Sequence, residues 1–187
     1  MTDPQAPDAM HVMVDLETLG TEPFSPILSI GACRFQLTPN IGEPGVADVF
    51  YQPITLESCF DVGLKPSAST TLWWMQQSKE AQKVFTDPAA IALPEALDRF
   101  TDFLNSRPDE MWGNSARFDF GLLSAAYRAC GKEIPWEHWR ERCYRTMKTL
   151  PMVQHIKLER FGTYHNALDD ALSQARHLRA ILLHLGA

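Results

Sequence analysis

The 187-residue sequence has no uninterrupted apolar stretch of the roughly 18 residues that a membrane helix needs. Its first nine residues, MTDPQAPDA, lack the basic region and apolar core of a secretory signal, so we expect residues 1–9 to form a short mobile tail. The four cysteines include no C-x-x-C pair and have no histidines at zinc-finger spacing. We therefore expect reduced thiols in a cytoplasmic protein that does not contact membranes.

The composition excludes a fibrous or disordered chain. Hydrophobic residues make up 45% of the sequence and charged residues 21%, which are ordinary values for a soluble domain. At roughly 150 residues per domain, the length corresponds to about one domain, and no repeat or linker interrupts it. We expect a single domain over residues 10–187.

Negative charge exceeds positive charge, with a formal net charge of −6. This excess argues against a protein that passively coats nucleic acid, because such proteins are usually basic. Residues 128–160 differ from the rest, with eight Lys or Arg and four Glu. This stretch is either a solvated face or a strip that follows phosphates, in which case Arg140, Arg142, Arg145 and Lys148 would hold the upstream strand.

The hydrophobic pattern changes along the chain. Short β-branched or alternating segments come first and predict three strands in an antiparallel meander. Helical spacing and short apolar runs then alternate, which indicates an α/β fold with a mixed sheet of five or six strands flanked by helices. The predicted strands are 11–15, 27–37, 46–51, 110–113 and 141–146. The predicted helices are 69–77, 80–85, 94–105, 119–130 and 166–185.

Two carboxylates stand at the end of the first predicted strand. Asp15 and Glu17 are two residues apart, so their side chains point to the same side of an extended chain. Adjacent carboxylates repel each other unless they are protonated or share a cation, and Mg²⁺ prefers oxygen ligands. Alone, the pair fits either a metal site or the ordinary polar end of a strand.

Further candidates lie at two predicted helix starts. Asp119 is either a functional acid or a first-turn residue that interacts with the helix dipole. Asp170 lies near the inner face of the last helix, and His165 precedes that helix after the flexible Gly162. His165 and Asp170 are either a base and a metal ligand, or a helix cap and a solvent-facing acid.

Taken in order, these motifs resemble the DEDDh-type (DnaQ-like) superfamily of 3′–5′ exonucleases, and within it the phage-type and ribonuclease AS-like branch. The resemblance extends from Val12 to about Leu182 and implies a ribonuclease H-like fold. The stretches that carry it are DLETLGT (15–21), ILSIGA (27–32), TLWWMQQS (71–78), WGNSARFD (112–119) and HNALDDA (165–171).

The resemblance implies a role for each candidate. The metal-binding acids, which would hold two Mg²⁺ or Mn²⁺ ions, fall on Asp15, Glu17, Asp119 and Asp170. The general base falls on His165, five residues before Asp170, which is the spacing of the histidine type. In the tyrosine type a Tyr lies four residues before that acid, where this chain has Asn166. The same spacing favours Asp170 over Asp169.

The implied reaction is hydrolysis of the last phosphodiester at the 3′ end of RNA or single-stranded DNA, with release of nucleoside 5′-monophosphates. Family members line the terminal nucleotide with residues after the D-x-E pair, which indicates Thr18 and Leu19. Either Trp73 or Trp74 is a candidate for base stacking, but tandem tryptophans cannot both face the same way.

Asn114 and Arg117 are candidates for contacts with the terminal nucleotide or a phosphate. Because related ribonucleases are often homodimers, the resemblance also implies a homodimer. Two other functions stay open: a catalytically silent nucleic-acid- or partner-binding module on the same fold, and an unrelated metal-dependent hydrolase of small nucleotides. The complete set of four acids and one histidine argues against the silent module.

Overall fold

The computed structural model describes residues 9–37, 46–104 and 108–186. Residues 1–8 of the predicted tail lie outside these ranges, as does residue 105 of the predicted helix 94–105. Ala9, the last residue of the predicted tail, is buried. Within the described ranges, no helix combines the length and apolar character needed to cross a membrane.

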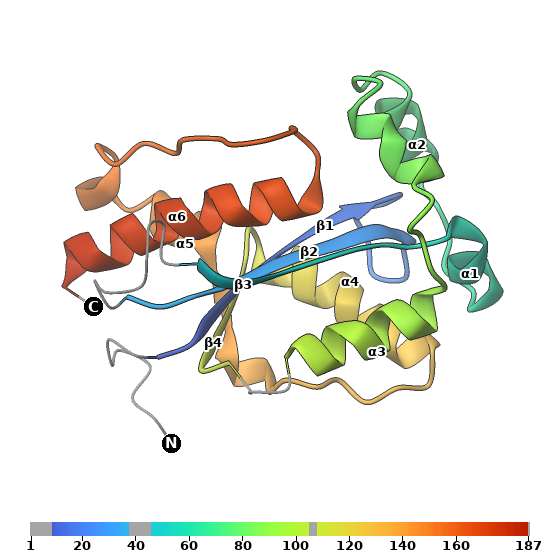
Figure 1. The fold of residues 1–187 in the computed structure, drawn as a ribbon, viewed down its shortest axis with the longest axis horizontal. Helices are drawn as coiled ribbons and strands as arrows, with labels where there is room; N and C mark the ends of the chain where they lie inside the picture. The colour runs from blue at the N-terminus through green and yellow to red at the C-terminus, as the bar shows by residue number, and fades with distance from the viewer. Residues whose placement is uncertain (1–8, 38–45, 105–107, 187) are drawn as a thin grey trace.

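A five-stranded mixed sheet forms the centre of the molecule, with strand order β3-β2-β1-β4-β5 (Figure 1). Neighbouring strands are antiparallel from β3 to β1 and parallel from β1 to β5, so the predicted meander and mixed sheet are confirmed. The strands are β1 (His11–Thr18), β2 (Ile27–Phe35), β3 (Val46–Pro53), β4 (Glu110–Gly113) and β5 (Glu141–Cys143).

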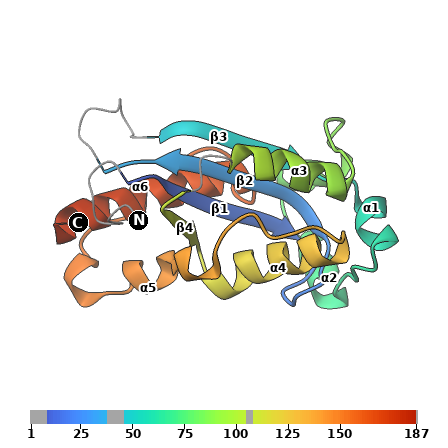
Figure 2. The same cartoon turned by 90° about the horizontal axis from the view of Figure 1, so that it is seen from below.

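Helices cover both faces of the sheet, with α6 on one face and α3 and α4 on the other (Figures 1 and 2). The short helices α1 and α2 lie together beyond the end of the sheet where β1 stops (Figure 1). The α-helices are α1 (Leu56–Asp61), α2 (Ala68–Trp74), α3 (Leu93–Phe103), α4 (Ala116–Ala129), α5 (Tyr144–Lys148) and α6 (Ala167–Leu185). Three 3-10 helices occupy Ala81–Thr86, His138–Arg140 and Pro151–Val153 within the described part of the chain.

Alternation along β1 decides which side chains meet which helices. Val12 and Val14 belong to the apolar core beneath α3 and α4, whereas Met13 packs with α6 on the opposite face. Since side chains alternate along a strand, Asp15 and Glu17 lie on the α6 side with Met13. The strand therefore presents both acids to the helix that carries Asp170.

A glycine sets the distance between α6 and the sheet. Gly31 of β2 is the register partner of Asp15, and a Cβ added there would lie 2.1 Å from the main chain of Ala167. Only a residue without a side chain permits this approach. The first turn of α6 consequently lies directly over the strand neighbour of Asp15. The helix begins where Asn166 Oδ1 accepts hydrogen bonds from two main-chain N–H groups of that turn.

One secondary-structure prediction was wrong, and one helix was not predicted. The predicted strand 141–146 ends at Cys143, and α5 begins at Tyr144, whose ring is fully buried against α6 and whose hydroxyl lies 2.6 Å from His177 Nδ1. Helix α1 was not predicted, and the short helix expected at 80–85 is present as the 3-10 helix Ala81–Thr86. Packing of one buried aromatic ring therefore ends β5 where local propensity alone favoured continuing it.

Candidate active site

The two acids of β1 lie at the point where its pairing with β2 becomes irregular. The register shifts between Glu17 and Thr18, and such bulges re-aim side chains at the ends of strands. Asp15 Oδ1 accepts a 2.7 Å hydrogen bond from Gln174 Nε2 on α6. Glu17 is buried, although it carries an ionisable group.

Asp119 reaches the same region from the first turn of α4. Its carboxylate Oδ2 accepts a hydrogen bond from the Ser115 N–H, and its side chain is only about 1% exposed. Gly113, the last residue of β4, makes room for it, because a Cβ there would lie 2.6 Å from Asp119 Oδ2. Since β4 is the parallel neighbour of β1, this carboxylate lies beside the end of β1.

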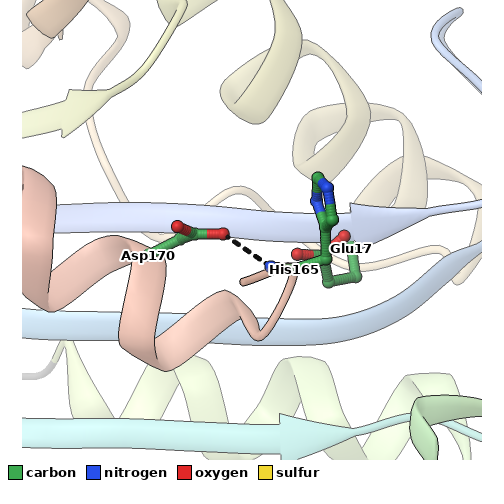
Figure 3. Close-up of side chains that lie close together, drawn as sticks. All are labelled: Glu17, His165 and Asp170. Carbon is green, nitrogen blue, oxygen red and sulfur yellow. Dashed lines mark hydrogen bonds between the residues drawn. The ribbon is translucent and has the colours of Figure 1, made fainter. Parts of the chain in front are cut away.

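Asp170 completes the group of acids from the first turn of α6. One ligand atom from each of Glu17, His165 and Asp170 lies within 4.8 Å of the others (Figure 3). The adjacent Asp169 has a different role, since its Oδ2 accepts a 2.7 Å hydrogen bond from the Thr163 N–H. Packing therefore directs Asp170 towards the other acids and Asp169 to the preceding loop.

His165 has a strained main-chain conformation. Its φ of 63° is in the left-handed region, which non-glycine residues adopt at an energetic cost. Asp170 Oδ2 accepts a hydrogen bond from the His165 N–H, drawn in Figure 3, and the Trp73 ring packs edge-on against the imidazole at 4.8 Å. These contacts hold the imidazole beside Glu17. Burial lowers the pKa of His165, which keeps the ring neutral and able to accept a proton near neutral pH.

Burial disfavours the charged forms of all four carboxylates, and neighbouring acids add to this effect at Asp15 and Glu17. Burial raises the pKa of Asp15 well above its ordinary value, and the charges of Asp119, Glu17 and Asp170 raise it further. Burial also raises the pKa of Glu17 to about 8 and that of Asp119 to about 7. Oxygen donors from three separate elements thus converge, and among the described residues the one ion pair that involves them joins Asp170 to Arg160. A hard divalent cation fits this donor set, because it would favour the ionised carboxylates that burial disfavours.

The raised pKa of Glu17 predicts a pH-dependent stability of the metal-free protein. Because about 8 is above the ordinary value of 4.5, the folded protein holds a proton that the unfolded chain releases between these pH values. The contribution of Glu17 to the free energy of unfolding should therefore be greatest at low pH and fall as pH rises towards 8. Over about pH 5 to pH 8 the free energy of unfolding should fall by at least about 2 kcal/mol. Since roughly 2–4 °C of melting temperature corresponds to 1 kcal/mol, we expect the melting temperature in EDTA to fall by at least about 4 °C.

Scanning calorimetry with and without Mn²⁺ measures this effect. Added Mn²⁺ should diminish the fall, and Glu17→Gln should flatten the curve measured in EDTA. A melting temperature in EDTA that rises over the same pH range would contradict the assigned direction of the pKa shift.

A hollow of about 400 Å³ opens next to these acids. It is lined by Leu16, Glu17, Thr18, Thr21, Ser69, Thr70, Trp73 and Phe118. Trp73 is 40% exposed, so part of its indole ring is accessible from the hollow that it lines. The hollow therefore combines an acidic end with two aromatic side chains, a pattern suited to a nucleotide.

The structure separates the residues predicted to contact substrate. Trp74 is buried, and its Nε1–H donates a hydrogen bond to the Thr18 carbonyl oxygen. Leu19 is buried in the same small apolar cluster. The side chains of Trp74 and Leu19 are therefore packed in the interior, and substrate contact by either of them stays a prediction. Thr18 and Trp73 line the hollow itself.

The remaining predicted contacts lie outside the hollow. Asn114 Oδ1 accepts a hydrogen bond from Lys148 Nζ, which connects α5 to the end of β4. Arg117 is exposed on the first turn of α4. In the predicted basic strip, Arg140 and Arg142 form ion pairs with Glu137 and Glu110, so both have acidic partners.

Three residues at the site were missed by sequence reasoning. Gln174 and Phe118 occupy ordinary helix positions, although Gln174 lies one helical turn after Asp170 and Phe118 directly precedes Asp119. Arg160 forms a 2.7 Å ion pair with Asp170. No spacing rule connects Arg160 to the acids, because the segment that carries it has no regular secondary structure.

Comparison with known proteins identifies the family of this chain. The sequence model of the 3′–5′ exoribonuclease Rv2179c-like domain matches residues 10–182. This chain belongs to that family. No curated protein sequence gives a match.

Solved structures share the fold of this family member at low identity. The nuclease domain of 3′hExo, a DEDDh family member bound to rAMP, gives a TM-score of 0.61 at 14% identity over 94% of this chain and 92% of that one. S. pombe Pop2p, in a Mg²⁺- and Mn²⁺-bound form, gives 0.62 at 13% identity over 91% of this chain and 82% of that one. A product-bound exonuclease I gives 0.59 at 14% identity over 95% of this chain but only 46% of that one.

The predicted DEDDh superfamily and ribonuclease H-like fold are therefore confirmed. Membership of this family makes the chain an enzyme of the 3′–5′ exonuclease class.

Proposed function

We propose that this enzyme removes nucleotides one at a time from the 3′ end of single-stranded RNA, using two Mg²⁺ or Mn²⁺ ions, and releases nucleoside 5′-monophosphates. The observation that carries the proposal is the convergence of Glu17, His165 and Asp170 within 4.8 Å, beside a hollow of about 400 Å³ lined by Trp73 and Phe118. The family description favours RNA, and single-stranded DNA is the alternative substrate.

Each residue has a defined role in the proposed reaction. Asp15, Glu17, Asp119 and Asp170 would hold the cations. When bound, the cations supply Lewis-acid activation of water and neutralise negative charge at the phosphate. Neutral His165 accepts the proton of the attacking water, which requires the low imidazole pKa that burial produces. The 3′-terminal nucleoside lies in the hollow, where Trp73 stacks on its base.

A gel time course tests the proposal. Matched 5′-labelled RNA and DNA oligonucleotides are incubated with Mn²⁺, and the Asp15→Asn variant serves as the control. The expected result is a ladder that shortens from the 3′ end, faster for RNA and absent with the variant. Faster shortening of DNA would make single-stranded DNA the preferred substrate in place of RNA. Cleavage of neither strand by folded, metal-bound protein would refute the proposed activity.

The exposed indole of Trp73 leads to a prediction about substrate affinity. Stacking of one base on an aromatic ring contributes roughly 1–3 kcal/mol, so Trp73→Ala should raise KM about 10-fold or more. Trp73→Phe should restore most of this loss. Leu72→Ala is the matched control, because Leu72 is the exposed neighbour on α2 and does not line the hollow. Steady-state kinetics in which both alanine variants raise KM equally would exclude stacking by Trp73.

A further inference from the structure

The segment that precedes α6 runs alongside this helix (Figure 1). Residues 156–163, which we call the strap, are attached to α6 at several points. The Ile156 carbonyl oxygen lies 2.9 Å from His177 Nε2, the Phe161 N–H donates to Ser173 Oγ, and the Thr163 N–H donates to Asp169. Although it has no regular secondary structure, the strap is held in a defined position along the helix.

The strap places one cation on the candidate metal site. Arg160 Nη1 lies 2.7 Å from Asp170 Oδ1, and the Asp170 side chain is only 13% exposed. The Arg160 guanidinium also lies over the Tyr164 ring, 4.5 Å from its centroid. Because the neighbouring Phe161 main chain is bonded to α6, the side chain of Arg160 can move while the strap stays in place.

Both oxygens of Asp170 have partners in this arrangement. Oδ2 accepts from the main-chain N–H of His165, and Oδ1 accepts from Arg160. A divalent cation held by Asp170 and Glu17 would repel a guanidinium at hydrogen-bond distance from the same carboxylate. Of the two donors, only Arg160 is a flexible side chain, so it is the group that a cation would displace.

We propose that Arg160 is the counter-ion of Asp170 in the metal-free enzyme, and that cation binding releases its guanidinium to a phosphate of the bound strand. This inference rests on the metal site of the proposed function. A guanidinium is suited to the second of these roles, because its planar fork binds phosphate oxygens in pairs.

Neighbouring charges support a phosphate as the second partner. Burial lowers the pKa of Lys148, and the charges of Arg145 and Arg160 lower it further. Arg145 and Arg160 are therefore both near Lys148, whose Nζ donates a hydrogen bond to Asn114 Oδ1 just after β4. Once released, Arg160 would join two other cations at the same rim, where an anionic strand is the complementary ligand.

Mn²⁺ binding without nucleic acid is the first arm of the test. Isothermal titration calorimetry should show that Arg160→Ala binds Mn²⁺ about 3- to 10-fold more tightly than the unmodified enzyme, because the competing charge is gone. Arg99→Ala is the matched control: Arg99 forms an ion pair of the same 2.7 Å length with Glu95, and its side chain is 53% exposed compared with 50% for Arg160. This control should leave Mn²⁺ affinity unchanged.

Strand binding is the second arm. Fluorescence anisotropy measures a labelled single-stranded RNA with Mn²⁺ in the slow His165→Ala background. Adding Arg160→Ala should weaken RNA binding about 5-fold and reduce the salt slope by about 0.7, the value for one lost phosphate contact on a single strand. Arg160→Lys should keep part of the affinity. A role in folding alone would not strengthen Mn²⁺ binding while it weakens RNA binding.

Two results would overturn the inference: equal Mn²⁺ affinity for Arg160→Ala and Arg99→Ala, or RNA binding that does not weaken. If Arg160→Ala does not fold, Arg160→Gln replaces it in both arms. Absence of Mn²⁺ binding by the unmodified enzyme would overturn the proposed metal site as well, so the two failures are distinguishable.

Discussion

Asp15→Asn is expected to reduce cleavage by at least about 10³-fold while the protein stays folded. The variant removes one carboxylate from a site that holds cations, and metal-assisted stabilisation of the transition state amounts to several kcal/mol, each ~1.4 kcal/mol being tenfold in rate. The amide has nearly the same shape as the carboxylate. Its oxygen can still accept the hydrogen bond from Gln174 that Asp15 accepts.

The same variant should be at least as stable as the unmodified protein in EDTA. Burial and three neighbouring charges raise the pKa of Asp15, so the ionised carboxylate opposes folding in the absence of metal. An asparagine removes that opposition. Single-turnover cleavage assays and melting temperatures in EDTA measure the two effects on one sample.

Asp61→Asn is the control for Asp15→Asn, because Asp61 is an exposed acid at the end of α1. It should leave both the rate and the melting temperature unchanged. Activity within about tenfold of normal in Asp15→Asn would exclude Asp15 as a metal ligand. An unfolded Asp15→Asn protein would instead show that the charge of Asp15 is required for the fold.

His165→Ala is expected to slow hydrolysis by roughly 10²–10⁴-fold, the usual contribution of a general base. Mn²⁺ binding should persist, since the four carboxylates stay in place. The rate should recover in part when imidazole is added, because the small base can enter the space left by the side chain. His138→Ala is the control, because His138 is an exposed histidine 27 residues before His165 in the sequence. This variant should leave the rate of hydrolysis unchanged.

Mn²⁺ titration separates the general-base role from the alternative role of a metal ligand. His165 lies within 4.8 Å of the ligand atoms of Glu17 and Asp170, so both roles are geometrically open to it. If His165 is the general base, His165→Ala leaves the Mn²⁺ affinity nearly unchanged, and added imidazole restores part of the cleavage rate. A large loss of Mn²⁺ affinity without rescue would assign His165 to the metal instead.

Local patterns in the sequence predicted most of the sheet and the order of the site residues. Period-two alternation in β1 places Asp15 and Glu17 on one side, and helical spacing defines α6 with Asp170 in its first turn. These features depend only on backbone geometry within one element, so the sequence alone is sufficient to predict them. The resemblance to exonucleases added the prediction that His165 is the base.

Contacts between distant segments decided the rest. The sequence left either Trp73 or Trp74 as a stacking residue, and the packing of α2 against Leu19 buries Trp74 and exposes Trp73. It placed Arg160 in the basic stretch 128–160 but contained no signal for its contact with Asp170, which it reaches from an irregular strap.

What the sequence by itself determined is therefore which residues share a face of one strand or helix, because that follows from the periodicity of the backbone. Which faces meet was decided by the tertiary structure. The close approach of α6 to Gly31 is the clearest case, since it brings Asp170 and His165 over Asp15 and Glu17, and it depends on the packing of a strand and a helix more than a hundred residues apart.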